Sequence, residues 1–293
     1  MPTVRDLRDR IRSLKNTQQI TKAMKQVAAA KIRRAEVAQR RARPYADALS
    51  GMLQDLIAAV SSVDDPFMRP GRAGAPSGIV LVSADKGLAG AFNSNVIAQA
   101  QQAARERGEV RYYSIGLKAR NAVRRMNARD SQSWPLSAGS KLDTAREVAT
   151  SAADDFRAGN IAEIVLVSQR LVSMMAQRPQ TRKLVPILAD DVTALRSSEN
   201  SQRRAQGAIE FLPSPELVLS RLLPKYLEFT IYSAMLETEA AFFAAQLVAM
   251  TNATDNASKL IDELTIQMNN ARQAAITKEL LEIVAGAEAL GVE

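Results

Sequence analysis

The sequence contains no cysteine and no histidine among its 293 residues. Without thiols, a disulfide framework, a cysteine zinc site and a thiol redox switch are excluded. Without imidazole, the commonest general base and the commonest transition-metal ligand are missing, so catalysis would have to depend on carboxylates, lysines or hydroxyl groups. The composition therefore argues against most hydrolase and oxidoreductase designs, and we expect no cofactor and no metal.

Aromatic residues make up only 4% of the chain, which has 13 glycines and 11 prolines. This composition favours long helices over a β-rich fold. The longest wholly apolar runs fall far short of a membrane span. The first residues, MPTVRDLRDRIR, carry charge where a signal peptide needs an apolar core. We therefore expect a soluble, cytoplasmic protein.

Basic charge is concentrated near the start of the chain. Between Thr3 and Arg43 thirteen lysines and arginines face three acids, a net charge of +10, whereas the remaining residues comprise 26 basic and 28 acidic ones. The +8 of the whole chain therefore belongs to this first segment. Such a stretch implies an acidic surface nearby, which could be nucleic acid, an anionic membrane face or an acidic protein.

Residues 1–65 are predicted to form one long helix. Their apolar residues recur mostly in steps of three and four, a heptad-like stripe with a shift of register in the middle. Asp64, Asp65 and Pro66 are expected to end the helix, and residues 66–77 to form a linker. The stripe consists of Val4, Leu7, Ile11, Leu14, Ile20, Met24, Val27, Tyr45, Leu49, Met52, Leu56, Val60 and Val63.

Residues 78–190 change to strands that alternate with helices. Ile79–Val82 and Ile164–Val167 are continuous apolar runs, and Val110–Ile115 is a third stretch rich in β-formers. This pattern predicts a Rossmann-like α/β domain with a mostly parallel sheet covered on both faces. The Ala-rich segments predicted to be helical are 93–107, 117–127 and 141–158.

Two further segments complete the middle of the chain. Leu184–Leu188 is expected to add a fourth strand to the sheet. Residues 191–214 are polar and rich in serine and asparagine, so we expect a loop.

Residues 215–293 are predicted to form a second very long helix, with Pro224 as a local kink near its start. We expect it to pair with the first helix as a long antiparallel coiled coil. Because the last helix is the longer one, its end should extend past its partner and leave Ile276, Leu280, Ile283 and Val284 uncovered. The seam of this helix is predicted at Ala257, Ile261, Leu264, Met268, Ala271 and Ala275.

Three long segments carry a resemblance to a known family, in the family's own order. They are Ser13–Ala35 (SLKNTQQITKAMKQVAAAKIRRA), Val248–Ser258 (VAMTNATDNAS) and Ile276–Ala289 (ITKELLEIVAGAEA). On these motifs the chain resembles, over its whole length, the gamma subunit of rotary F-type ATP synthases of the bacterial type. The first two are similar to the family's N-terminal and C-terminal shaft sequences, and the third to its signature.

A fourth segment matches the family less closely. Ser83–Asn95 (SADKGLAGAFNSN) is similar to the family's strand-to-helix turn. Lys86, Ala89 and Ala91 differ from the more usual Arg, Cys and Gly.

The resemblance implies a rotor. In the family the antiparallel coil sits inside a hexamer of three alpha and three beta subunits that holds the catalytic sites, and the globular base sits on the membrane ring of c subunits. Proton flow turns ring and shaft, whose asymmetry drives the beta subunits through their binding states. For this chain the resemblance implies a non-catalytic subunit with alpha, beta, epsilon and c subunits as partners, no nucleic acid, and a peripheral position on the cytoplasmic face of the inner membrane.

The resemblance also implies roles for particular residues. Contacts with the beta loops that grip the shaft are implied for Met24, Lys25, Arg272 and Gln273. The basic helix that faces an acidic beta segment is represented by Arg33, Arg34, Arg40 and Arg41. The residues expected inside the sleeve of the hexamer are Ile276, Leu280, Ile283, Val284, Gly286 and Ala287.

The segment before the last helix is expected to lie near the c ring. Phe211 and Pro213 fit the family's aromatic and proline positions, whereas Leu212 stands where the family carries an acid. The expected contact through Phe211 and Leu212 would therefore lack its polar part.

The residues by themselves leave other interpretations open. A basic coiled coil that binds nucleic acid and an α/β enzyme that binds a phosphate at Gly87–Gly90 are the two alternatives from other classes. Because neither a P-loop nor a GxGxxG motif is present, a tight turn at Gly87–Gly90 is the favoured interpretation. Spacing alone would make Met24 an ordinary seam residue, Arg272 a solvated side chain and Gly286 a helix C-cap.

Overall fold

The computed structural model describes residues 3–59, 65–126, 128, 131–137, 139–187, 212 and 214–290, with the backbone alone at 58, 59 and 287–290. Its contacts divide the chain into two units. One unit joins residues 1–28 with 246–293, and the other comprises residues 29–245. Two long helices, α1 (Val4–Ala59) and α6 (Pro215–Leu290), contribute residues to both units.

The larger unit is built on a five-stranded sheet with the strand order β3-β2-β1-β4-β5. The first four strands in this order pair in parallel, and β5 pairs with β4 in the antiparallel direction. The strands are β1 (Ser77–Val82), β2 (Val110–Ile115), β3 (Gln132–Trp134), β4 (Glu163–Ser173) and β5 (Ala176–Val185).

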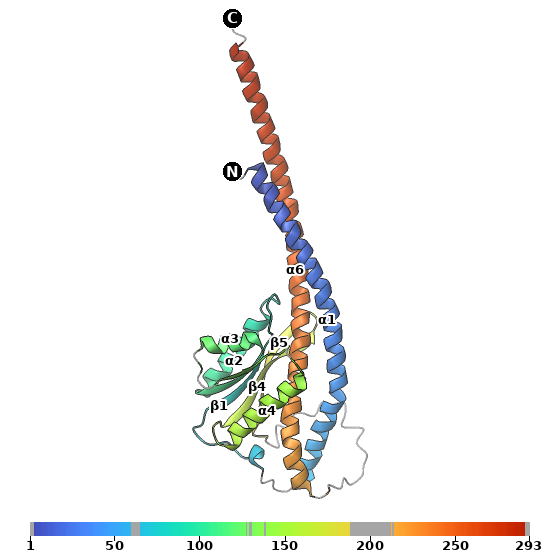
Figure 1. The fold of residues 1–293 in the computed structure, drawn as a ribbon, viewed down its shortest axis with the longest axis vertical. Coiled ribbons are helices and arrows are strands. Elements are labelled where there is room, and N and C mark those ends of the chain that lie inside the picture. The colour runs from blue at the N-terminus through green and yellow to red at the C-terminus, as the bar shows by residue number, and fades with distance from the viewer. Residues whose placement is uncertain are drawn as a thin grey trace. The chain divides into compact units, whose positions relative to one another are not determined.

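Helices cover both faces of this sheet (Figure 1). Alternate residues of β1 point to opposite faces, so Val80 and Val82 pack with α4 and with parts of α1 and α6, whereas Ile79 and Leu81 pack under α2 and α3. All of β1 is buried, which is why Ile79–Val82 is a continuous apolar run. The helices are α2 (Phe92–Arg107), α3 (Leu117–Arg125) and α4 (Lys141–Arg157), with a short 3-10 helix, η1 (Pro66–Met68), before β1.

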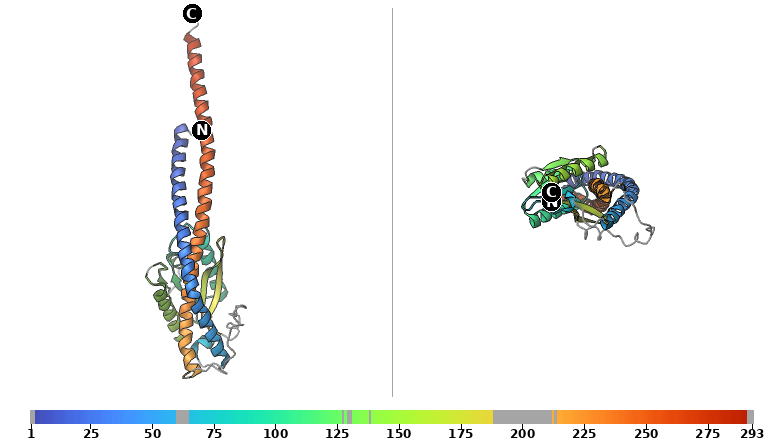
Figure 2. Two further views of the ribbon diagram at one scale, coloured as in Figure 1. Left: turned by 90° about the vertical axis from the view of Figure 1, so that its right-hand side faces the viewer. Right: turned by 90° about the horizontal axis from the view of Figure 1, so that it is seen from below.

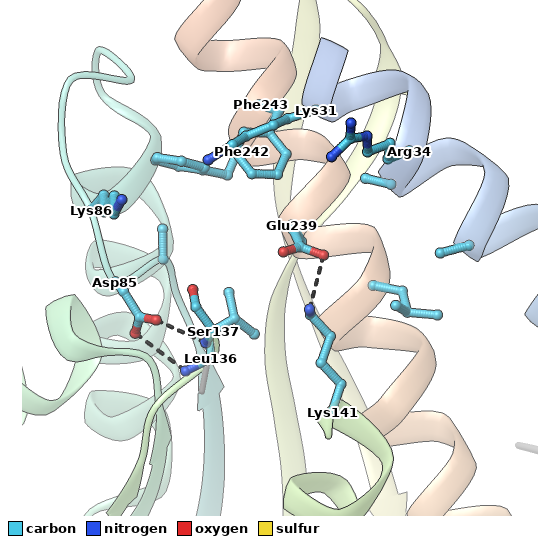
Figure 3. Close-up of a pocket in the computed structure, with 14 residues that line it drawn as sticks. Lys31, Arg34, Asp85, Lys86, Leu136, Ser137, Lys141, Glu239, Phe242 and Phe243 are labelled. Atoms are coloured by element: carbon cyan, nitrogen blue, oxygen red, sulfur yellow. Dashed lines mark hydrogen bonds and ion pairs between the residues drawn. The ribbon is translucent and has the colours of Figure 1, made fainter. Parts of the chain in front are cut away.

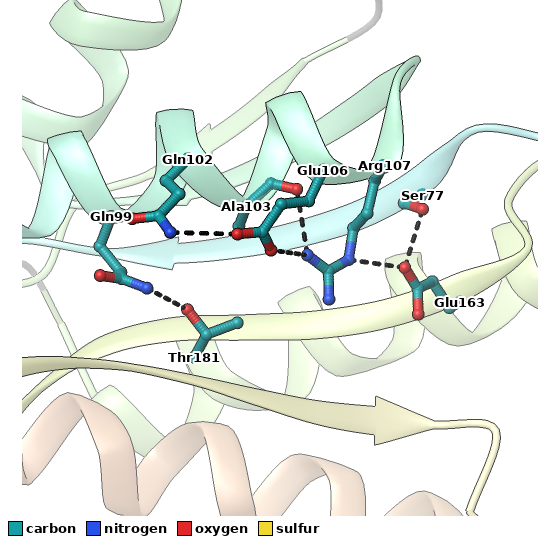
Figure 4. Close-up of polar contacts among 8 residues, drawn as sticks. All are labelled: Ser77, Gln99, Gln102, Ala103, Glu106, Arg107, Glu163 and Thr181. Atoms are coloured by element: carbon teal, nitrogen blue, oxygen red, sulfur yellow. Dashed lines mark hydrogen bonds and ion pairs between the residues drawn. The ribbon is translucent and has the colours of Figure 1, made fainter.

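Polar contacts attach the end of α2 to the sheet (Figure 4). Arg107 Nε donates to Glu163 Oε1 at 2.7 Å, and the Ser77 hydroxyl donates to the same oxygen at 2.9 Å. These two bonds join α2, β1 and β4 at the amino-terminal edge of the sheet.

The predicted α/β fold is confirmed, and the strand and helix positions in this unit are close to those expected. Two details of the sheet differ from the prediction. The strand β3 was not expected, because it has only three residues and two of them, Gln132 and Ser133, are polar. Of the fourth expected strand, 184–188, only Leu184 and Val185 are in a strand, the one that begins at Ala176. Pro186 and Ile187 follow its end, and Leu188 lies outside the described residues. Most of the first residues of β5 are polar and at least partly exposed, so the sequence did not indicate where this strand begins. The start of β5 is defined by its pairing with β4.

The smaller unit is an antiparallel pair of helices, formed by the first turns of α1 and the last turns of α6. Figures 1 and 2 show the two segments side by side, with α6 continuing past the first residue of α1. Thr21 and Thr254 face one another, with their hydroxyl oxygens 2.8 Å apart. Leu7 and Ile11 are buried in α1, and Met250 is buried in α6. The coiled coil expected from the sequence is therefore confirmed.

The expected shift of register in α1 is wrong. Ile20 is 60% exposed and Val27 is 53% exposed, whereas their neighbours Thr21 and Ala28 are buried. One unbroken series in alternating steps of four and three residues is buried or half-buried along the helix. It consists of Leu7, Ile11, Leu14, Gln18, Thr21, Lys25, Ala28, Ile32, Ala35, Gln39, Ala42, Ala46, Leu49, Leu53 and Leu56.

Small and polar residues in this series explain the error. A search for large apolar side chains selects Ile20 and Val27, which lie outside the series, as do Tyr45 and Met52 with exposed fractions of 52% and 48%. In the middle of the series the small side chains of Thr21, Ala28 and Ala35 are buried, and they allow close approach of the helices. Val60 and Val63 lie outside the described residues.

The predicted seam of α6 is correct from Ala257 to Ala271 and wrong at Ala275, which is exposed. Val4 precedes Thr21 by seventeen residues, and Ala271 follows Thr254 by seventeen. The first residue of α1 therefore lies opposite Ala271 of α6. α6 itself continues through Pro224 and reaches Leu290.

Candidate functional site

The last described turns of α6 form an exposed helical tail. Every residue from Arg272 to Gly286 is exposed, including four large apolar side chains that the sequence predicted to be uncovered. Their exposed fractions are 49% for Ile276, 57% for Leu280, 67% for Ile283 and 54% for Val284. Leu281, at 64%, adds an apolar side chain that the sequence analysis did not single out. The side chain of Ala287 lies outside the described set.

The residues predicted to contact the beta loops form two separate places on the two-helix unit. Met24 and Lys25 are half-buried close to the level of Thr21 and its partner Thr254, and Lys25 belongs to the seam series. Arg272 and Gln273 are exposed at the start of the tail. About twenty residues of helix separate the two levels along α6, or roughly 30 Å at 1.5 Å per residue. The two places therefore lie at different levels of the two-helix unit.

The basic face of α1 consists of Arg33, Arg34, Arg40 and Arg41, all exposed. The seven-residue spacing places Arg33 above Arg40 and Arg34 above Arg41, in two adjacent rows outside the seam. Within the described part of the chain, none of the four forms an ion pair. The rows therefore present a positive surface that no acid of the described chain neutralises.

The turn that follows β1 contains a carboxylate that the sequence analysis missed. Asp85 accepts hydrogen bonds from the backbone amides of Leu117 (2.9 Å), Leu136 (3.2 Å) and Ser137 (2.8 Å). Burial alone would raise the pKa of Asp85, but the hydrogen bonds from Ser137, Leu117 and Leu136 outweigh it and hold the pKa below its ordinary value. An acid three residues after the end of a buried strand was the signal that could have identified it.

Hydrogen bonds of the Asn93 side chain explain the geometry of the turn at Gly87–Gly90. The Asn93 side chain accepts from the Ala84 amide at 3.2 Å and donates to the Lys86 carbonyl at 3.0 Å, which closes the turn. Gly90 has φ of +56°, a conformation that suits glycine. The arrangement favours the tight-turn interpretation over a phosphate site at Gly87–Gly90.

The segment expected near the c ring is described only in part. Leu212 is 75% exposed and borders a shallow cavity of about 220 Å³ with Leu217, Val218, Arg221 and Leu222. Phe211 and Pro213 lie outside the described residues. None of the described helices is long and apolar enough to cross a membrane.

Comparison with known proteins gives consistent matches over nearly the whole chain. A family model described as ATP synthase matches residues 3–290. The ATP synthase gamma chain of Heliobacterium modesticaldum is 41% identical over 292 residues, covering 99% of this chain and 100% of that one. The ATP synthase gamma chain of Pelotomaculum thermopropionicum is 42% identical over 292 residues, with the same coverage.

Solved structures share the fold at low identity. A chain of the Euglena gracilis mitochondrial ATP synthase, from an OSCP/F1/c-ring structure, aligns with 98% of this chain and 94% of its own length at a TM-score of 0.67 and 18% identity. A chain of the Tetrahymena thermophila mitochondrial ATP synthase, from a central stalk and c-ring structure, aligns with 80% of this chain and 99% of its own length at a TM-score of 0.58 and 20% identity. With the family model and the relatives above 40% identity, the chain belongs to the ATP synthase gamma chain family.

Proposed function

We propose that the chain is the rotating shaft of a bacterial ATP synthase, which couples rotation of a membrane c ring to ATP synthesis or hydrolysis at an alpha/beta hexamer. The observation that carries this proposal is the exposed tail of α6, because fifteen consecutive exposed helical residues with several large apolar side chains need a surrounding partner. A sleeve formed by the hexamer would cover them. Membership in the gamma chain family supports the same assignment.

In this proposal the chain performs no chemistry itself. The nucleotide sites are on the beta subunits, and this chain transmits torque between them and the ring. Its partners are the alpha and beta subunits, the epsilon subunit and the c ring, and it lies peripherally on the cytoplasmic face of the inner membrane. Phe211 and Leu212 would lie near the ring, and the leucine would make an apolar contact there.

The tail would fit the sleeve of the hexamer through its apolar side chains, its narrow tip and a few polar contacts. Ile276, Leu280, Ile283 and Val284 would lie against the apolar wall of the sleeve. Gly286 and Ala287 would keep the tip narrow. The small side chains of Gly286 and Ala287 would let the helix rotate inside the sleeve without steric clashes.

Arg272 and Gln273 would provide the polar grip at the start of the tail. A solvated arginine on a free helix contributes almost nothing to an interaction. Enclosed by a beta loop, a guanidinium makes charge-assisted hydrogen bonds worth roughly 1.5 to 3 kcal/mol each. Met24 and Lys25 would contact a different loop, because they lie at another level of the shaft.

The test of this proposal is the double variant Arg272→Ala with Gln273→Ala, assembled into membranes with the other ATP synthase subunits. We expect the complex to assemble with full subunit content and its ATP-driven proton pumping to fall several-fold. The matched control is Gln101→Ala with Arg105→Ala, two exposed residues on α2 of the same types. Normal pumping by the tail variant in complexes of full content would refute the grip at these two residues, and failure of the wild-type chain to join the complex would refute the shaft itself.

A further inference from the structure

A cavity of about 360 Å³ lies in the larger unit, beyond the carboxyl ends of the parallel strands β1 and β3. Figure 3 shows it between the residues that follow these strands and the facing turns of α1 and α6. Ala84, Asp85 and Lys86 follow β1, and Leu136 and Ser137 follow β3. In open α/β sheets, ligands bind in the crevice outside the carboxyl ends of the strands. The volume lies within the range of small-molecule pockets.

The cavity has a cationic rim and an apolar interior. Lys31, Arg34, Lys86 and Lys141 contribute four positive charges, against two negative charges from Asp85 and Glu239. The apolar part is formed by Ala35, Ala38, Ala84, Leu136, Leu236, Phe242 and Phe243.

Both acids of the rim already have partners. Asp85 accepts the three backbone amides described above, and Glu239 forms an ion pair with Lys141 at 3.2 Å. In the described part of the chain, by contrast, Arg34 and Lys86 pair with no carboxylate. Lys31 lies 5.3 Å from the centre of the Phe243 ring. Three cations therefore border the cavity without an acid to neutralise them.

Three backbone amides at this end of the sheet already have a partner. Backbone amides at the ends of parallel strands and at helix starts commonly hold phosphates. Here the Asp85 carboxylate takes the amide at the start of α3 and the two amides after β3. Cationic side chains that line the cavity can hold an anion instead, and Arg34 and Lys86 approach it from opposite walls in Figure 3.

We propose that this cavity binds a small organic anion with an aromatic or apolar body and one phosphate or carboxylate group. The body packs against Phe242 and Leu136, and the anionic group lies between Arg34 and Lys86. This site is separate from the surfaces assigned to the shaft function, except that Arg34 also belongs to the basic face. The binding proposal can fail without affecting the rotor assignment.

The experiment is calorimetric titration of the full-length chain with phenyl phosphate, compared with inorganic phosphate and benzyl alcohol. We expect phenyl phosphate to bind more tightly than either partial probe, because only it matches both the rim and the interior. Arg34→Gln with Lys86→Gln should weaken its binding roughly tenfold or more. Arg120→Gln with Arg124→Gln, two exposed arginines of α3, removes the same charge and should leave binding unchanged.

A second variant tests the cavity with the charges kept. Ala38→Phe fills the space from α1 and should abolish phenyl phosphate binding. If this variant does not fold by circular dichroism, Phe243→Leu is used instead; it removes part of the apolar wall and should weaken phenyl phosphate binding. Equal weakening by the cavity and α3 double variants would show non-specific charge attraction and overturn the proposal. An acidic peptide that binds through Arg34 and Lys86 where phenyl phosphate does not would overturn it as well, since the surface would then be a protein contact.

Discussion

The hydroxyl oxygens of Thr21 in α1 and Thr254 in α6 lie 2.8 Å apart inside the seam of the two-helix unit. Each is also within hydrogen-bond distance of a carbonyl of its own helix, that of Gln18 at 3.0 Å and that of Met250 at 2.7 Å. One hydroxyl therefore donates across the seam while the other donates to its own backbone. This polar pair marks one level of the seam at which the two helices contact each other.

The seam should tolerate loss of the Thr21–Thr254 hydrogen bond better than a larger side chain at a buried position. Thr21→Val keeps the shape, and the Thr254 hydroxyl can still donate to Met250, so we expect the free energy of unfolding to change by less than about 1 kcal/mol. Ala28→Leu forces a larger side chain into a fully buried position and should lower it by about 1–3 kcal/mol. Urea unfolding of the full-length chain followed by helix circular dichroism measures both. A larger loss of stability from Thr21→Val than from Ala28→Leu would contradict the close approach of the helices.

Asp85 should make the stability of the α/β unit depend on pH. Its pKa is lower in the folded chain than its ordinary value of 3.8, so its contribution is complete above that value and is lost as the pH falls through the folded pKa. Asp85→Asn should lower the free energy of unfolding by about 1–2 kcal/mol at neutral pH, since charge-assisted bonds to three amides are weakened.

The measurement is the difference in unfolding free energy between wild type and Asp85→Asn as the pH is lowered from 7 to 3. This difference should shrink below about pH 4, where the carboxylate becomes protonated. Asp143→Asn, at an exposed site at the start of α4, is the control. A difference that stays constant across the range would mean that the charge of Asp85 does not contribute.

Gly116 should be the glycine least tolerant of substitution at the carboxyl end of the sheet. It has φ of +98°, and a Cβ atom there would lie 2.2 Å from the Ser83 carbonyl oxygen. Gly116→Ala should therefore lower the free energy of unfolding by more than about 2 kcal/mol. Gly90→Ala has open space around the new methyl group and should cost about 1 kcal/mol, from its φ of +56° alone. Equal costs would show that the backbone near Ser83 relaxes freely.

The basic face of α1 should act on an acidic protein partner and not on nucleic acid. Arg33→Gln, Arg40→Gln and Arg41→Gln together leave Arg34 and the cavity untouched. We expect fewer protons pumped per ATP hydrolysed, with nucleotide binding at the hexamer intact. The same three changes at Arg120, Arg124 and Arg125 of α3 are the control. Strong DNA affinity at physiological salt that disappears in the α1 variant would contradict the assignment.

The exposed tail should contribute to assembly and little to the stability of the chain by itself. Leu280→Ser with Ile283→Ser changes two side chains that are more than half exposed, so the thermal midpoint of the isolated chain should stay within about a degree or two. Assembly with the hexamer or torque transmission should fall. Hydrogen exchange of the isolated chain should be fast from Arg272 to Gly286 and slow in β1 and β4. Slow exchange throughout the tail would contradict this view.

Local patterns in the sequence were sufficient for the elements that have a clear period. The apolar runs at Ile79–Val82 and Ile164–Val167 identified two central strands, because strands buried on both faces need apolar residues throughout. The length of α6 relative to α1 was enough to predict an uncovered tail. The motifs at both ends of the chain led to the family that the comparisons confirm.

The tertiary structure decided what depends on contacts between distant residues. The seam runs through Thr21 and Ala28 because two helices can approach closely there, although neither residue belongs to an apolar stripe. The start of β5 is set by pairing with β4, since its own residues are too polar to indicate a strand. Asp85 gains its role from amides 32 to 52 residues away. Composition and periodicity report what a residue does with its near neighbours in the chain, whereas seam, strand register and carboxylate partners arise only when remote segments are brought together.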